Sequence, residues 1–243
     1  MTDHDVIVVG GGVAGLSAAT FTARHDFETT VIDAGDAILR RNAHLENFPG
    51  FPAGVNARLL LAMMRDQAER SGCPVVEADV TSVEETDGEF AVETAGGDRY
   101  RSRYVVAATK NEVDYLDPVE GVGIVDRGKT FVDCDEHGRT GVDGLYAAGR
   151  LAGKPHQAVV SAGHGAEVAV TLLEDDDAPF YHDWVAPEGY FTGRDREVPP
   201  GCEEIDDEEF RRREATSLEV LRAYVSDPYP EGPRRHPSLR DAE

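Results

Sequence analysis

Val6-Ile7-Val8-Val9-Gly10-Gly11-Gly12-Val13-Ala14-Gly15, near the start of this chain of 243 residues, is the stretch that decides the fold. Its apolar run is typical of a buried strand, and its glycines form the pattern Gly-x-Gly-x-x-Gly at the start of a helix. Gly10 permits a tight turn, Gly12 lets a diphosphate approach the backbone, and Gly15 lets the helix pack closely on the strand. The free N–H groups at the helix start are suited to binding phosphates.

A second predicted strand, Thr29–Asp33, ends in a carboxylate eighteen residues after Gly15. Asp33 therefore lies where a hydrogen-bond acceptor for a ribose hydroxyl is needed. The two features together predict a site for an adenine dinucleotide. The alternative is an ordinary strand–turn–helix with three glycines, and the accompanying strand, helix and acid argue against it.

The chain is strongly acidic, with 47 Asp and Glu against 24 Lys and Arg and a formal net charge of −23. Such a field repels nucleic acids and anionic membranes, so we expect neither as a partner. Lysine occurs only at Lys110, Lys129 and Lys154. Because an acidic, lysine-poor surface is typical of proteins that work in molar salt, we expect a halophilic protein that loosens at low ionic strength.

Other sequence features set the expected class and compartment. Met1–Asp5 lead directly into the first strand, and no apolar run reaches membrane-spanning length, so we expect a cytoplasmic protein without a membrane anchor. The cysteines at 73, 134 and 202 are far apart, which predicts neither a disulfide framework nor a metal site. Cys134 is expected to be a small buried hydrophobe.

The remaining pattern predicts an α/β fold with three layers. A parallel Rossmann-like sheet is expected to have helices on one face and a meander over 75–100 on the other. Further predicted elements are a helix capped by Asn56 and ended by Gly72, strands within 75–107, a poorly patterned connection over 111–127, short strands near 131–133 and 144–149, and a helix over about 157–173.

The sequence from residue 174 onward has a different composition. It contains an aromatic stretch, then a predicted amphipathic helix over about 206–224, then a Pro- and Arg-rich end from 227 that we expect to be loosely ordered. The aromatic residues either cover the face of a bound cofactor or dock this extension to the core; they are Phe180, Tyr181, Trp184, Tyr190 and Phe191. The expected apolar face of the helix consists of Ile205, Phe210, Leu218, Leu221 and Val225.

Later motifs resemble those of the thioredoxin-reductase-like branch of two-dinucleotide-binding flavoproteins. Gly138–Gly149 is similar to the second FAD motif of that family, and His156–Gly163 to its flavin-contacting helix. Asn47–Gly50 is similar to the loop beside the isoalloxazine. Val105–Thr109 resembles the Ala-Thr-Gly strand end, with Lys110 where glycine is usual. The resemblance extends over residues 5 to 173 and implies an FAD-dependent oxidoreductase.

The resemblance also implies a domain division and a set of site residues. We expect an FAD-binding domain over residues 1–173 and a C-terminal extension over 174–243. Gly149 would approach the ribityl–phosphate chain, and the backbone N–H of Ala158 would reach the flavin ring. With the first glycine turn, the candidate cofactor-binding residues are Gly10, Gly12, Val13, Ala14, Gly15, Asp33, Ala34, Asn47, Val80, Ala108, Thr109, Gly149, Arg150, His156, Gln157 and Ala158.

Besides Lys110, the chain departs from the family pattern in several features. Arg150 replaces the acid that usually contacts the ribityl chain, and a guanidinium can donate hydrogen bonds but cannot accept them. Ala37–Arg40 replaces a Gly-Gly-Gln segment. The connection between about 111 and 129 is too short for the family's NAD(P)H domain, and the sequence has no Cys-x-x-Cys pair. Direct reduction of thioredoxin is therefore not expected.

Three functions remain open. The leading interpretation is an FAD-dependent oxidoreductase that transfers electrons through flavin, with NAD(P)H as a transient reductant or a separate redox protein as the donor. A second is a non-catalytic or regulatory FAD-binding protein. A third, motivated by Arg150, is an NAD-binding protein with a decayed flavin site. No catalytic side chain is predicted, and the resemblance suggests a homodimer with the C-terminal extension as its candidate interface.

Overall fold

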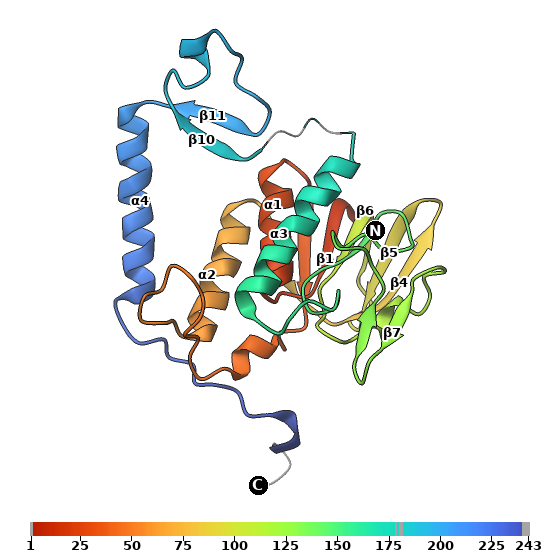
Figure 1. Cartoon of the computed structure of the whole chain (residues 1–243). Coiled ribbons are helices and arrows are strands. Elements are labelled where there is room, and N and C mark those ends of the chain that lie inside the picture. Colours follow the sequence, from red (N-terminus) through yellow and green to blue (C-terminus); the bar gives the residue numbers. More distant parts are fainter. Residues whose placement is uncertain (1, 178, 180–181, 240–243) are drawn as a thin grey trace.

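The computed structural model describes residues 2–177, 179 and 182–239 (Figure 1). No helix in this described part is both long and apolar enough to cross a bilayer. The strands and α-helices, in chain order, are β1 (Thr2–Val9), α1 (Val13–Arg24), β2 (Thr29–Asp33), α2 (Ala57–Arg70), β3 (Val75–Glu77), β4 (Val80–Thr86), β5 (Glu89–Thr94), β6 (Arg99–Ala107), β7 (Ile124–Asp126), β8 (Thr130–Val132), β9 (Leu145–Ala147), α3 (Ala158–Asp175), β10 (Trp184–Pro187), β11 (Cys202–Ile205) and α4 (Asp207–Val225). The 3₁₀ helices are Ile38–Arg41, Asp114–Leu116, Thr192–Arg194 and Pro237–Leu239.

Strand β1 lies at the centre of the main sheet and pairs in parallel with β2 on one side and β6 on the other. Strand β3 extends the β2 side in parallel, and β9 pairs in parallel with the last residues of β6. The first half of β6 pairs antiparallel with β5, which in turn pairs with β4. Val75–Val76, predicted as the start of the meander, is therefore part of the parallel sheet. The crossover through α2 returns the chain alongside β2, which makes this short apolar pair an edge strand.

Alternate side chains of β1 face two separate cores, as expected for a strand covered on both faces. Val6 and Val8 pack with α1, α2 and α3, whereas Ile7 and Val9 pack with meander residues such as Phe90. Figure 1 shows the three helices on one side of the sheet and β4 and β5 on the other. The predicted three-layer α/β fold is confirmed.

The connection between β6 and β9 contains more regular structure than its sequence pattern predicts. It forms the hairpin β7–β8, whose turn is closed by a hydrogen bond from the Gly128 N–H to Asp126 Oδ1 at 2.7 Å. Asn111 Nδ2 donates to the carbonyl of Thr130 at 2.8 Å and so ties the end of β6 to this hairpin. The prediction of an unpatterned connection is wrong at β7. Strands of three residues are too short to show a hydrophobic period, and they are fixed here by the turn and by a long-range contact.

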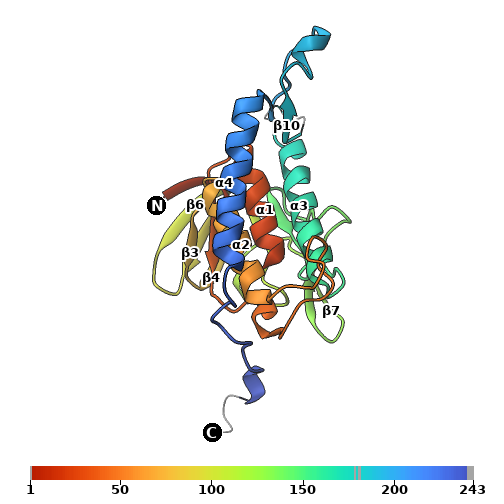
Figure 2. The same ribbon diagram turned by 90° about the vertical axis from the view of Figure 1, so that its left-hand side faces the viewer.

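Helix α4 confirms the predicted amphipathic helix, and Asp206 caps it by accepting from the Glu209 N–H at 2.8 Å. It stands outside α2, on the side away from the sheet (Figures 1 and 2). Its predicted apolar face is not covered by the rest of the described chain, because Phe210, Leu218 and Val225 are 49 to 61% exposed. The homodimer suggested by the resemblance stays a prediction.

The aromatic stretch lies far from the glycine turn. Arg24 at the end of α1 donates to Asp183 at 2.7 Å, so β10 sits beside the C-terminal end of a helix whose N-terminal end holds the glycines. Trp184, Tyr190 and Phe191 pack edge-on against one another, with ring centroids 4.5 to 5.8 Å apart. For these residues the interpretation as a cofactor cover is wrong. The other two aromatics of the prediction, Phe180 and Tyr181, lie outside the described residues.

The segment after α4 is held against the body, although its composition predicts loose order. The buried Arg58 donates through Nε to the carbonyl of Glu231 at 3.1 Å. Arg234 donates its backbone N–H to the carbonyl of Arg40 at 2.9 Å and its guanidinium to the carbonyl of Gly35 at 2.6 Å. These backbone-directed contacts, which composition does not encode, fix residues 231–234 on the loop that follows β2.

Candidate functional site

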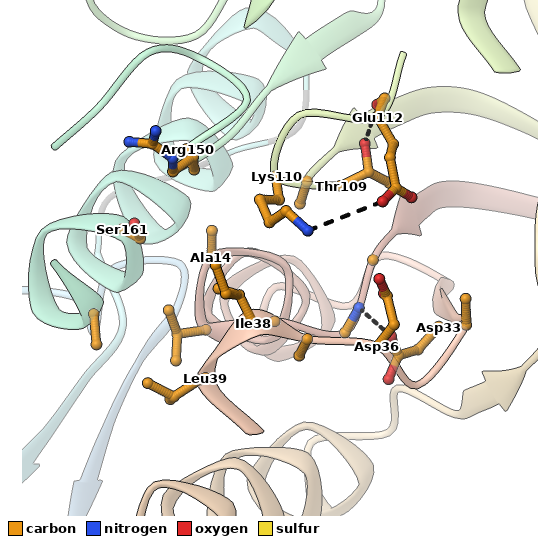
Figure 3. A pocket seen from close by; sticks show the side chains of 18 of the residues that line it. Ala14, Asp33, Asp36, Ile38, Leu39, Thr109, Lys110, Glu112, Arg150 and Ser161 are labelled. Carbon is orange, nitrogen blue, oxygen red and sulfur yellow. Dashed lines mark hydrogen bonds and ion pairs between the residues drawn. The ribbon is translucent and has the colours of Figure 1, made fainter. Parts of the chain in front are cut away.

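A cavity of about 540 Å³ opens where β1, β2 and β6 end (Figure 3). Ligands in open α/β sheets bind at this edge, and the volume lies within the range of about 300–1,000 Å³ found for small-molecule sites. Five segments form its walls: the turn between β1 and α1, the loop after β2, the residues that join β3 to β4, the end of β6, and the start of α3 with the residues before it.

The local sterics explain why glycine is found at each of the three positions of the first turn. Gly10 has φ +109°, and a Cβ there would lie 2.8 Å from the carbonyl oxygen of Ala108. A Cβ on Gly15 would lie 3.1 Å from Val8 Cγ1 and far closer to the oxygen of Gly10, so the helix could not pack on the strand. At Gly12 nothing lies within 4 Å of the added atom, so its open side remains available to a ligand.

Asp33 is held rigidly at the end of β2. Its side chain is buried, and Oδ1 accepts the Gly11 N–H at 3.0 Å. A Cβ on Gly11 would lie 2.6 Å from Asp33 Oδ2, so glycine is required for this contact. Within the described part of the chain, Oδ2 accepts no hydrogen bond and is available to a ligand hydroxyl.

Two helices begin at the cavity without side-chain caps. The N-cap residues are Gly12 for α1 and Gln157 for α3, and neither offers a side-chain acceptor to the first turn. The first N–H groups of both helices are therefore free to bind a ligand. Asn47 Nδ2 donates to Gln157 Oε1 at 2.7 Å and joins the loop after β2 to the start of α3.

The two helices approach each other closely behind the cavity wall. A Cβ on Gly149 would lie 2.6 Å from Ala14 Cβ, and one on Gly165 would lie 2.7 Å from the carbonyl carbon of Ala14. Apart from Gly15 and Gly149, which lie behind the wall, every predicted cofactor-binding residue lines the cavity.

His164 supports the second glycine motif and was not found by sequence reasoning. It is buried, its Nδ1 accepts the Gly149 N–H at 2.9 Å, and its Nε2 lies 3.3 Å from the carbonyl of Glu136. These partners assign the proton to Nε2, which donates to Glu136. Burial lowers the pKa of His164, and the nearby Lys154 lowers it further, which favours the neutral ring that accepts the Gly149 N–H.

Charges are distributed unevenly around the cavity. Figure 3 shows Lys110 and Arg150 on the wall opposite Ile38 and Leu39, with Asp33 and Asp36 toward one end. Lys110 Nζ lies 4.0 Å from Glu112 Oε1, and burial raises the pKa of Glu112, as does the neighbouring Asp36.

Sequence reasoning missed most of the loop after β2 and much of the wall formed by the end of β6. The sequence did contain a signal at Lys110, because this residue stands where the family has glycine. The structure agrees, since Lys110 has φ +68°, a conformation that favours glycine. The loop departs from the family pattern, so no motif pointed to its members. The additional lining residues include Asp36, Ala37, Ile38, Leu39, Asn42, His44, Glu46, Asp79, Lys110, Glu112, Tyr115 and Ser161.

Residues 4–109 match the family model described as pyridine nucleotide-disulphide oxidoreductase. Over 118 residues the chain is 37% identical to a bifunctional thioredoxin reductase/thioredoxin of Mycobacterium leprae, which covers 47% of this chain and 26% of that protein. Over 113 residues it is 36% identical to a thioredoxin reductase of Streptomyces clavuligerus, which covers 45% of this chain and 35% of that protein. The match thus spans about a third or less of the length of these curated relatives.

The fold is also shared with solved structures. A thioredoxin reductase from Gloeobacter violaceus superposes with a TM-score of 0.63 at 19% identity, covering 74% of this chain and 99% of that chain. At this identity the likeness concerns the fold alone. The resemblance predicted from the motifs is confirmed: the chain is similar in sequence to thioredoxin reductases over somewhat less than half of its length, and it shares their fold.

Proposed function

We propose that the chain binds FAD in this cavity and acts as an FAD-dependent oxidoreductase. One observation carries the proposal: two uncapped helix starts and a buried, fixed carboxylate converge on a single cavity. A protein that binds NAD alone needs only the first helix start and the carboxylate. The second helix start, joined to the first half of the chain through Asn47 and Gln157, favours the longer flavin dinucleotide.

Each part of the cavity has a task that its chemistry fits. The free N–H groups of Val13 and Ala14 would bind the diphosphate, with Gly12 leaving room for it. Asp33 Oδ2 would accept a ribose hydroxyl. The start of α3 would direct N–H groups and a positive dipole at the redox-active ring. FAD, when bound, would supply the electron transfer itself.

The reductant would reach the site from outside the FAD-binding unit. The chain passes from β6 to β9 through the hairpin β7–β8, which takes the place where thioredoxin reductases carry an NAD(P)H domain. Free NAD(P)H or a separate redox protein is therefore the proposed electron donor. Cys134 and Cys202 are each half-buried single thiols, and burial raises the pKa of both, so a direct dithiol exchange with thioredoxin is not proposed.

The test is the visible spectrum of the protein purified in high salt, with chromatography of the released cofactor. We expect a flavin spectrum and FAD close to one per chain. Gly12→Val places a side chain in open space within the cavity, so it should abolish FAD binding without unfolding the protein. Gly193→Val, at an exposed glycine that also has nothing within 4 Å, is the matched control and should retain FAD.

The same experiment separates the alternatives. A colourless protein that cannot be reconstituted with FAD overturns the proposal, and bound NAD in its place would identify a nicotinamide binder. Stoichiometric FAD that neither NADH, NADPH nor dithionite-reduced carrier proteins can reduce would leave FAD binding intact and favour a regulatory flavoprotein.

A further inference from the structure

Lys110, Arg150 and His156 line the cavity, and Lys129 lies near His156 on the β7–β8 hairpin. Lys110 and Lys129 are two of the three lysines in the chain, and they lie close enough to His156 to act on its charge together with Arg150. Burial lowers the pKa of His156, and the charges of Arg150, Lys129 and Lys110 lower it further, in that order. His156 and Lys129 are exposed, so an anion in solution can reach both side chains.

This group is not neutralised by the protein, although carboxylates outnumber cations 47 to 24. Across residues 2–177, 179 and 182–239, neither Lys129 nor Arg150 forms an ion pair, and Lys110 approaches Glu112 only at 4.0 Å. Like charges held together raise the electrostatic free energy of the folded state. The ring of Phe131 beside Arg150 offsets part of that cost, and a bound anion would offset more of it.

The fold holds these side chains in place. Lys110 keeps a left-handed backbone that costs about 1 kcal/mol for a residue with a Cβ, and such conformations concentrate at functional sites. The next residue, Asn111, is bonded to the β7–β8 hairpin at Thr130. The guanidinium of Arg150 lies over the ring of Phe131, with its central carbon 5.8 Å from the ring centroid. Lys129 lies in the turn of the same hairpin, directly before β8.

We propose that Lys129, Arg150 and His156, with Lys110 behind them, bind the anionic group of the substrate: a small molecule that carries phosphate or carboxylate groups. The claim that this anion belongs to the redox substrate rests on the proposed function, whereas the anion site itself does not. The hairpin that replaces the NAD(P)H domain thereby contributes a substrate contact of its own. Phosphate and carboxylate share the chemistry that a lysine, a guanidinium and an imidazolium recognise.

The first test is a titration of the FAD-loaded protein with inorganic pyrophosphate and, separately, with citrate at constant ionic strength. The readout is the NMR signal of the His156 Cε1 proton, followed against pH. We expect a saturable shift and a rise in the pKa of His156, because a bound anion stabilises the imidazolium. A stronger response to pyrophosphate identifies a phosphorylated substrate, and a stronger response to citrate identifies a carboxylate.

Variants distinguish a specific anion-binding site from a general effect of positive charge on the protein. Lys129→Ala and Arg150→Gln should each weaken anion binding by about tenfold, the usual loss for one charge-assisted hydrogen bond. Lys154→Ala is the matched control: this lysine donates to the carbonyl of Glu136 at 2.9 Å and should leave anion affinity unchanged. Lys129 lies on an exposed hairpin, so its variant remains informative if Arg150→Gln does not load FAD. Equal weakening by Lys129→Ala and Lys154→Ala, or the absence of a saturable shift, overturns the inference.

The cofactor content of every sample, measured from its visible spectrum, distinguishes the two proposals. Protein that contains FAD but shows no anion response contradicts the anion site alone. Protein that responds to pyrophosphate at His156 but never retains FAD supports the anion site and contradicts the proposed function.

Discussion

Two glycines of α3 allow a sharp test of the close packing behind the cavity. Gly163 is exposed, and an added Cβ there would meet nothing within 4 Å. Gly165 lies two residues further on, and its Cβ would lie 2.7 Å from the carbonyl carbon of Ala14 and nearer still to its oxygen. The substitutions Gly163→Ala and Gly165→Ala thus add the same methyl group to the same helix in opposite surroundings.

The expected effects differ in sign. Replacing an interior helical glycine by alanine raises the free energy of unfolding by about 1 kcal/mol. Gly163→Ala should show this full increase, because the added methyl group meets nothing. Gly165→Ala has the same favourable helix propensity, but the added Cβ would lie closer to the Ala14 carbonyl than the 3.4 Å at which ordinary contacts begin. The substitution therefore forces α1 and α3 apart. Overpacking against backbone costs about 3 kcal/mol at the upper end of its usual range, which leaves a net loss of about 2 kcal/mol. For a chain of this size these values correspond to a melting temperature higher by about 2–4 °C for Gly163→Ala and lower by about 4–8 °C for Gly165→Ala.

The assay is thermal unfolding by circular dichroism, with both variants and the parent protein in the same salt and without cofactor. Because Ala14 lines the cavity, Gly165→Ala should also weaken FAD binding, which a titration of the unloaded protein would measure. A Gly165→Ala protein that melts at or above the parent would refute the close packing of α1 and α3 and the role assigned to these glycines.

Further predictions concern strain, protonation and salt. Lys110→Gly should raise the free energy of unfolding by about 1 kcal/mol in cofactor-free protein, because φ +68° suits glycine; a loss of stability would mean that the lysine side chain supports the fold. The folded pKa of His164 is lowered, so the unfolded chain takes up the proton first, and stability should fall as the pH drops below about 6.5. Denaturant titrations at pH 7.5 and 5.5 should show a smaller fall for His164→Gln; an identical fall would show that His164 contributes no pH dependence. Because the net charge is −23, the melting temperature should rise steadily between about 0.1 and 2 M KCl, and a flat profile would contradict the halophilic interpretation.

Local patterns in the sequence were enough to predict the frame of the fold. The run Val6–Val9, the three spaced glycines and Asp33 place a strand, a turn and an acceptor within one βαβ unit, and the structure has each of them. Asn56 was predicted as a helix cap from its position before a one-sided apolar stripe, and its Oδ1 accepts the Arg58 N–H at 3.0 Å. These features depend on residues close in sequence, so single-chain reasoning reaches them.

Contacts between distant segments were not predicted. His164 accepts the N–H of Gly149, fifteen residues earlier, and Arg58 holds the carbonyl of Glu231, which is 173 residues away. No periodicity or propensity indicates which carbonyl or N–H a buried side chain will contact. For the same reason the aromatic stretch was open to a role over the cofactor, and the ion pair between Arg24 and Asp183 places it at the opposite end of α1.

Net charge and local charge act on an anionic substrate in opposite directions. At 0.1 M salt the screening length is about 10 Å, so a molecule of net charge −23 repels an approaching anion before it reaches the cavity. At 1 M the length is about 3 Å, which removes most of that repulsion but leaves contacts within hydrogen-bond distance of Arg150 and His156 largely intact. Salt should therefore favour access to these side chains more than it weakens binding there. In that case the acidic surface and the cations of Lys110, Lys129 and Arg150 suit a protein that meets its substrate in concentrated salt.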